Sequence, residues 1–320
     1  MTLAISIGVP TGATITEQLE FIERAERSGF AGVGTADHLR YGQDAFVTLA
    51  AAAGRTSRII LHPAITNPVV RSPAVLAGLA NSLAQLAPGR TKLAIGAGDQ
   101  SAVEAGVSPA TLAQFREAVV SIRRLLHGEE VTFGTAPPLT LGNIADPPPP
   151  VVVTASGPKT IQTGAEVADE LLLFVGVDAS ILEAAMDHVA TGAERAGRTV
   201  ADVPITHYVF ASVADNEASA LERTRYWLDI WLTQGLFNVG LKALGIEPPE
   251  STDQRNLSHD ELRRLASAFF IVGTPEQAVE QLLQLQARGA QRVFCMLPGG
   301  TRSQWEATEL FAERVLPALR

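Results

Sequence analysis

Two neighbouring polar residues, Asp37 and His38, follow a short apolar run that ends at Thr35. A carboxylate beside an imidazole can hold or move a proton at a reacting centre, because an imidazole titrates near neutral pH. A structural interpretation is equally available, with Asp37 capping the next turn and His38 in an exposed loop. On these residues alone the two interpretations are balanced, and Asp37 and His38 form the candidate catalytic pair.

A candidate anion site lies in Ser156-Gly157-Pro158-Lys159-Thr160, where an apolar run passes into a helical pattern. Free backbone N–H groups at a helix start bind phosphate, glycine permits close approach, and Lys159 would add a positive charge. The alternative is an ordinary helix cap, with Ser156 before Pro158 in the first turn. On the motif alone this alternative is slightly the more common outcome.

Two further loops could receive a flat ring. Gly96-Ala97-Gly98-Asp99 would let a ring approach the backbone closely, and Thr66-Asn67-Pro68 could present hydroxyl and amide groups to the polar edge of that ring. Both segments are also ordinary turn signals. Each is therefore weak evidence by itself.

Other chemistries find no support in the sequence. It contains no G-x-S-x-G, H-E-x-x-H or phosphate-binding Walker motif, and its six histidines are well separated, so we expect no metal site. Cys295 lies inside an apolar run and is interpreted as a core residue. Trp227 and Trp231 share one helical face, which more often indicates packing than a substrate platform.

The elements that must position these residues alternate between strand and helix. Apolar runs that predict strands lie at 3–8, 30–35, 59–66, 91–95, 151–154, 170–175, 204–213 and 292–297. Such runs with helical crossovers indicate a parallel sheet buried on both faces. We predict a (β/α)8 TIM barrel, whose catalytic groups follow the strand ends. A doubly wound sheet is the alternative, but the first strand is not followed by G-x-G-x-x-G.

Length and composition agree with one soluble domain. The 320 residues are 46% hydrophobic and carry a net charge of −9, which argues against nucleic-acid or anionic-membrane binding through bulk charge. No stretch of 18 apolar residues is present, and the first residues lack a basic region. We expect a single domain over 1–320 of a cytoplasmic protein, with an insertion at about 235–271.

Four segments in this order resemble the bacterial luciferase-like family: TADH at 35–38, then 64–99, 151–173 and 272–285. The motifs GAGD and ASGPKT are most similar to those of the methylenetetrahydromethanopterin reductase branch. The resemblance implies a luciferase-like barrel and an oxidoreductase that uses coenzyme F420, a deazaflavin, for hydride transfer to or from a small organic substrate. A flavin (FMN) monooxygenase is the alternative, and a flavin-binding barrel without catalysis is the second alternative.

The resemblance also implies roles for residues. It places Asp37 and His38 at the reacting face of the ring, a non-prolyl cis peptide near Ile65-Thr66, and the insertion over the site. The cofactor-binding residues it implies are Ile65, Thr66, Asn67, Gly96, Ala97, Gly98, Ser156, Gly157, Pro158, Lys159, Thr160 and Gly176. The sequence departs from the family pattern at Ser72, where a basic residue is expected beside Arg71. The family and the alanine-rich stretches at 45–53 and 74–87 predict a homodimer.

Overall fold

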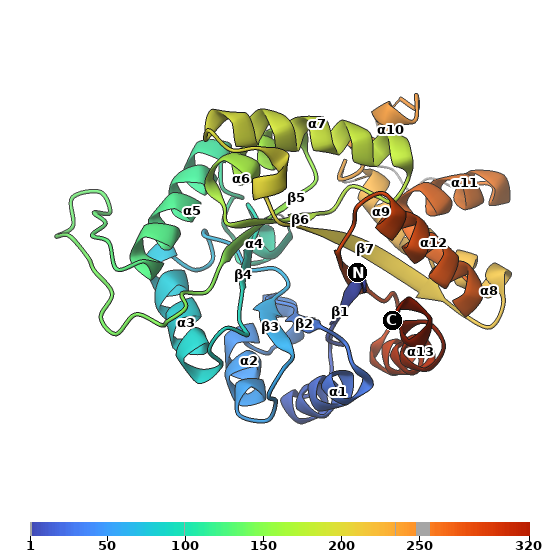
Figure 1. The fold of residues 1–320 in the computed structure, drawn as a ribbon, viewed down its shortest axis with the longest axis horizontal. Coiled ribbons are helices and arrows are strands. Elements are labelled where there is room, and N and C mark those ends of the chain that lie inside the picture. The colour runs from blue at the N-terminus through green and yellow to red at the C-terminus, as the bar shows by residue number, and fades with distance from the viewer. Residues whose placement is uncertain (1, 99, 234, 248–256) are drawn as a thin grey trace.

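A ring of parallel strands surrounded by helices forms the molecule (Figure 1). The computed structural model describes residues 2–98, 100–233, 235–247 and 257–320. Within these residues the ring has eight strands, which confirms the predicted barrel. They are β1 (Ala4–Gly8), β2 (Gly32–Thr35), β3 (Ile60–Pro63), β4 (Leu93–Ile95), β5 (Val151–Ala155), β6 (Glu170–Leu173), β7 (Ile205–Val213) and β9 (Arg292–Met296).

The ring closes between β3 and β4. Paired strands follow the order β3-β2-β1-β9-β7-β6-β5-β4, and every pairing in it is parallel. The isolated bridges Leu61–Thr91 and Thr66–Ile95 join the two ends of this order. Because the strands are parallel, their carboxyl ends open at one mouth, where the connecting loops converge.

The strands are apolar because both of their faces are covered. Ile7, Val33, Leu93 and Ile95 are fully buried between the interior of the barrel and the outer helices. Cys295 is also fully buried, on β9, and its burial raises the thiol pKa to about 12. Its interpretation as a core residue is confirmed.

A further strand, β8 (Phe270–Gly273), pairs with the carboxyl half of β7. It stands outside the order of the eight ring strands. Residues 270 and 271 were expected in the insertion, so the strand prediction is wrong at this point. β7 is long enough to pair with β6 and β9 through its first half and with β8 through its second half. The segment before β8 carries the helices α10 (Asn238–Ala243) and α11 (His259–Phe269).

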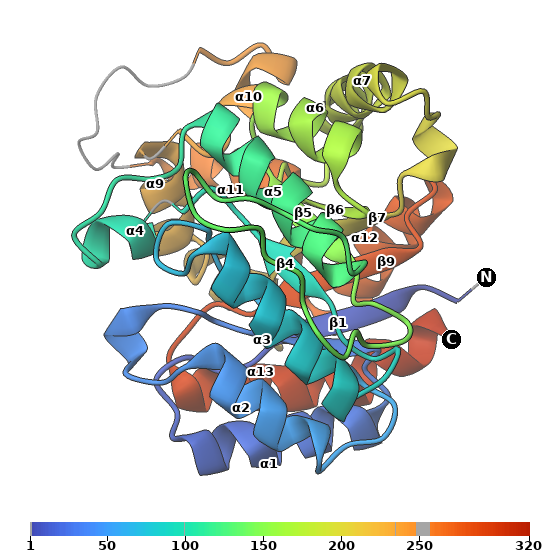
Figure 2. The same cartoon turned by 90° about the vertical axis from the view of Figure 1, so that its left-hand side faces the viewer.

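Helices cover the outside of the ring. Their bounds are α1 (Ile15–Ser28), α2 (Ala45–Ala53), α3 (Pro73–Leu86), α4 (Gln100–Glu104), α5 (Leu112–Leu126), α6 (Pro158–Val167), α7 (Ala179–Arg195), α8 (Glu217–Glu222), α9 (Arg225–Thr233), α10 (Asn238–Ala243), α11 (His259–Phe269), α12 (Pro275–Ala287) and α13 (Thr301–Arg314), with short 3-10 turns η1 (Leu39–Tyr41), η2 (Val200–Asp202) and η3 (Leu316–Leu319). In Figure 2, α4 and α9 lie at one end of the barrel, and both chain termini lie toward the other. None of the helices in the described part of the chain is long and apolar enough to cross a membrane.

Candidate active site

A cavity of about 390 Å³ opens among the carboxyl ends of the strands. Its walls come from the loops after β2, β3, β4 and β6, from β5 and β7, and from α4, α6 and α9. The lining residues are His38, Ala64, Ile65, Thr66, Asn67, Gly96, Ala97, Gly98, Gln100, Ser101, Thr154, Ala155, Ser156, Thr160, Phe174, Tyr208, Phe210, Trp231 and Leu236. A barrel enzyme carries its chemistry at this mouth.

Most of the expected site residues meet in this cavity. His38, Ile65, Thr66, Asn67, Gly96, Ala97, Gly98, Ser156 and Thr160 line it. Asp37, Gly157, Pro158, Lys159 and Gly176 are not among the described lining residues. Gly176 instead lies against α11, where an added Cβ would come within 2.8 Å of the Ala268 carbonyl oxygen. Asp99 lies outside the described residues.

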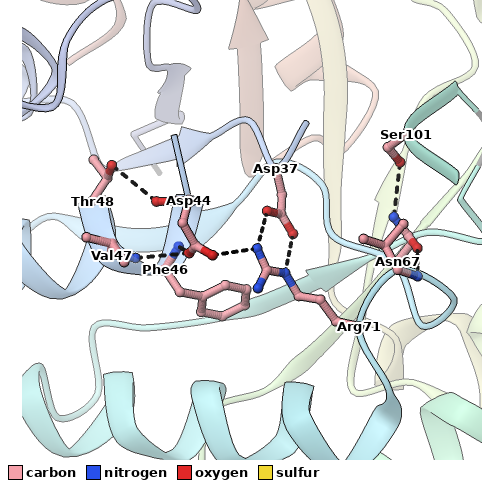
Figure 3. Close-up of polar contacts among 9 residues, drawn as sticks. Asp37, Asp44, Phe46, Val47, Thr48, Asn67, Arg71 and Ser101 are labelled. Carbon is pink, nitrogen blue, oxygen red and sulfur yellow. Dashed lines mark hydrogen bonds and ion pairs between the residues drawn. The ribbon is translucent and has the colours of Figure 1, made fainter. Parts of the chain in front are cut away.

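The two loops that follow β3 and β4 hold each other in place. The Asn67 side chain is buried; its Nδ2 donates to Ser101 Oγ at 3.0 Å, and its Oδ1 accepts from the backbone N–H of Val70 at 2.8 Å (Figure 3). Gly98 has φ +87°, and a Cβ there would meet the Asn67 side chain at 3.0 Å. Glycine is therefore required on both conformational and steric grounds. The cis peptide expected near Ile65-Thr66 is found at Ala64-Ile65.

Two buried hydroxyls on the cavity wall lack a protein partner. Thr66 Oγ1 and Thr154 Oγ1 have no hydrogen-bond partner among the described residues, and Thr66 is only 1% exposed. Buried polar groups are normally satisfied by a hydrogen bond, so these two hydroxyls differ from most of the buried polar groups of the molecule.

Helix α6 begins at the same wall. Its N-cap is Gly157, not Ser156 as the cap interpretation supposed, and no side chain caps the helix. The free N–H groups of its first turn therefore have no side-chain acceptor of their own. Ser156 and Thr160, on either side of this helix start, both line the cavity. This arrangement suits an anion.

His38 faces a carboxylate that the sequence did not indicate. Its Nδ1 lies 3.8 Å from Glu104 Oε2 on α4, and its ring lies 6.0 Å from that of Tyr41. Arg40 forms an ion pair with the other oxygen of Glu104. The His38 side chain is 29% exposed. Tyr208, Phe210 and Trp231 are further wall residues that the sequence did not mark as functional.

The Asp37 carboxylate binds Arg71. Arg71 Nε donates to Asp37 Oδ2 at 3.0 Å, and its Nη2 donates to Asp37 Oδ1 at 2.9 Å and to Asp44 Oδ2 at 2.8 Å (Figure 3). The hydrogen bonds that Arg71 donates to Asp37 in particular raise the pKa of Arg71 above its ordinary value. Asp44 also caps α2 through the N–H of Phe46. The loop that carries His38 is thereby tied to the α2 and α3 segments.

A metal centre is not part of this arrangement. Over the described residues, no group of three or more His, Cys, Asp or Glu side chains is placed to hold a metal ion.

A sequence profile of the luciferase-like monooxygenase family matches residues 2–292. This chain belongs to that family. The luciferase-like barrel and the oxidoreductase class expected from the sequence are thereby confirmed. A curated F420-dependent glucose-6-phosphate dehydrogenase from Beutenbergia cavernae is 30% identical over 321 residues, covering 94% of this chain and 93% of that protein.

Solved luciferase-like structures share the fold over the full chain. A coenzyme F420-dependent tetrahydromethanopterin reductase from Methanopyrus kandleri aligns with a TM-score of 0.80 at 22% identity, covering 100% of both chains. The oxygenating constituent of 3,6-diketocamphane monooxygenase from Pseudomonas putida, in complex with FMN, aligns with a TM-score of 0.68 at 19% identity. That alignment covers 99% of this chain and 98% of the other.

Proposed function

We propose that this luciferase-like protein is a coenzyme F420-dependent oxidoreductase that transfers hydride to or from a small organic substrate. The observation that carries the proposal is the convergence of His38, two unpartnered threonine hydroxyls and an uncapped helix start on one cavity. The 30% identity to an F420-dependent dehydrogenase favours the deazaflavin. FMN-dependent oxygenation is the second candidate, because FMN has a similar ring and phosphate.

The cavity residues fit such a cofactor. The Ala64–Asn67 and Gly96–Gly98 loops would flank the ring, and Thr66 Oγ1 would bind its polar edge. Ser156, Thr160 and the first N–H groups of α6 would hold the phosphate, with the exposed Lys159 adding charge. When bound, a deazaflavin supplies a carbon centre that accepts or donates a hydride.

His38 supplies the proton chemistry. When an alcohol is oxidised, its C–H electron pair leaves as hydride and its O–H proton must go to a base. His38 lines the cavity and can accept that proton, and the Glu104 carboxylate at 3.8 Å stabilises the imidazolium that forms. In the reverse direction the same imidazolium protonates the carbonyl oxygen. Asp37 acts through position, because its carboxylate is bound by Arg71.

The protein is also proposed to form a homodimer. Exposed apolar side chains on neighbouring helices, Val47 on α2 and Val75 on α3, support a homodimer through that face. A cytoplasmic location remains a prediction from the sequence.

Cofactor titration tests the proposed function. Coenzyme F420 and FMN are titrated separately into the protein, and ring fluorescence reports binding. We expect saturable F420 binding that Thr66→Val weakens, because the variant removes the unpartnered hydroxyl with little change of shape. Thr35→Val is the matched control, since Thr35 Oγ1 is also buried and unpartnered but does not line the cavity. Saturable FMN binding without F420 binding would replace the proposal by the second candidate.

A further inference from the structure

One side of the active-site cavity is a continuous aromatic surface. The aromatic wall consists of Phe174, Tyr208, Phe210 and Trp231, all of which line the cavity. Phe174 stacks on Tyr208 at 4.6 Å between ring centroids, and Tyr208 stacks on Phe210 at 5.7 Å. Trp231 lies 4.0 Å from Phe210. The lining also includes His38, Thr66 and Thr154, so the cavity combines an apolar aromatic wall with separate polar groups.

The aromatic wall is held rigid from behind. Phe237 packs against Phe174 at 5.3 Å and against Trp231 at 5.7 Å, and Phe270 packs against Trp231 at 5.5 Å. Phe237 and Phe270 are themselves buried. Rings packed on both sides have little freedom to move away, so a ligand meets a surface that is already formed.

The charges around the cavity do not suit a phosphorylated substrate. Within the described part of the chain, its lining contains neither lysine nor arginine. Two nearby guanidinium groups are already bound, Arg40 by Glu104 and Arg71 by Asp37 and Asp44. A phosphate dianion placed against buried aromatic rings without a cation would lose its hydration with no compensation.

The polar groups of the cavity suit an uncharged oxygen. Burial raises the pKa of the Tyr208 phenol, so this hydroxyl remains neutral. His38 and the neutral hydroxyls can exchange hydrogen bonds with an alcohol or a carbonyl oxygen. A cavity of about 390 Å³ is also near the lower end of the size found for small-molecule sites, so a substrate that shares it with a cofactor ring must be small.

We infer that the substrate is a small uncharged alcohol, or the matching ketone or aldehyde, with an apolar substituent that packs on the aromatic wall. This inference rests on the proposed function. In the oxidation, the C–H and O–H bonds break and the C=O bond forms. The hydride passes to coenzyme F420, and the proton passes to His38. A sugar phosphate is disfavoured as substrate by the same surface, because the anion site at the start of α6 is assigned to the cofactor phosphate.

Ligand binding without turnover gives the first test. Cyclohexanone and glucose 6-phosphate are titrated into the protein with and without coenzyme F420, and tryptophan fluorescence is recorded. Trp231 lines the cavity, whereas Trp305 packs on Phe21 of α1 outside it. We expect saturable quenching by cyclohexanone and none by glucose 6-phosphate. Trp231→Leu should weaken cyclohexanone binding about tenfold, measured by calorimetry, and Trp305→Phe should leave it unchanged.

Turnover separates the two proposals. Protein loaded with coenzyme F420 is assayed with cyclohexanol and with glucose 6-phosphate. Oxidation of cyclohexanol alone supports the inference. Oxidation of glucose 6-phosphate alone would overturn the inferred substrate class and leave the F420 proposal standing. Protein that binds cyclohexanone but neither binds nor reduces coenzyme F420 would overturn the proposed function, while the preference of the cavity for uncharged ligands would be supported.

Discussion

The Glu104 carboxylate lies 3.8 Å from Nδ1 of His38, although the two residues come from different loops of the barrel. His38 precedes η1, after β2, and Glu104 ends α4, after β4. The crossover helices between them in the chain bring both residues to the mouth of the barrel.

Replacing His38 should remove proton transfer and spare the cofactor. General acid–base assistance contributes about 10²–10⁴ in rate, so His38→Ala should lower turnover at least about a hundredfold. Cofactor affinity should stay within about threefold, since the hydroxyls and the α6 start remain. Glu104→Gln should lower turnover by a smaller factor, because the imidazole itself is kept. Steady-state assays and cofactor titration measure both; lost cofactor binding would make His38 a cofactor contact, and full activity would make it a bystander.

A larger side chain at the start of α6 should block binding of the cofactor phosphate. A side chain at Gly157 has open space in the structure and would stand at the N-cap of α6, where the free N–H groups begin. Gly157→Val should weaken cofactor binding more than about tenfold with the fold retained, measured by titration and circular dichroism. Gly142→Val is the matched control, because Gly142 is also in open space and belongs to another loop. Unchanged affinity in Gly157→Val would contradict the assigned phosphate site.

The pair between Asp37 and Arg71 should position His38 without touching substrate. Asp37→Asn removes the charge of a half-buried bidentate pair and should destabilise folding by about 1–3 kcal/mol in urea denaturation. Turnover should fall more than substrate affinity. Arg71→Lys should behave similarly, because an ammonium cannot make both hydrogen bonds to Asp37. If Arg71→Lys kept the stability and turnover of the wild type, the paired hydrogen bonds from the guanidinium to Asp37 would not be needed to position His38.

Stability should fall in mild acid because His62 is buried. Burial lowers the pKa of His62 to about 4, from the ordinary 6.5, although Glu170 opposes and Lys92 reinforces the shift. Between these pH values the unfolded chain binds a proton that the folded protein does not, so the free energy of unfolding decreases as pH falls. The loss amounts to about 3 kcal/mol and stops growing below pH about 4.

Urea denaturation between pH 7 and about pH 4 measures this loss. His62→Gln should flatten the dependence, whereas the same change at the exposed His127 should not. Burial also lowers the pKa of His207 to about 4, so His207 contributes in the same direction. The free energy of unfolding of His62→Gln should therefore still decrease as pH falls, but less steeply than that of the wild type. An identical slope in His62→Gln and the wild type would contradict the assignment.

Dimer formation should depend on the apolar face of α2 and α3. Val47 and Val75 are 56% and 52% exposed, in the first turns of two helices that pack together (Figure 2). Val47→Glu with Val75→Glu should convert a dimer into a monomer of 33.8 kDa in light scattering. Leu283→Glu, on α12, should leave the dimer intact. A monomeric wild-type protein would contradict the prediction.

The sequence by itself determined the ring of strands and many of the residues at its mouth. Continuous apolar runs such as 151–154 predict strands buried on both faces, and residues that follow such strands meet at one end of a barrel. His38, Asn67, Gly98 and Ser156 were found in this way. Local spacing was sufficient because each of these residues is placed by the strand directly before it.

Only the tertiary structure decided which side chains meet. Glu104 joins His38, and Arg71 binds Asp37, through loops that crossover helices bring together. The aromatic wall joins Phe174 after β6, Tyr208 and Phe210 on β7, and Trp231 on α9. β8 pairs with an extension of β7. These contacts join residues far apart in the chain. They depend on packing of the whole barrel, and local residue patterns carry no record of that packing.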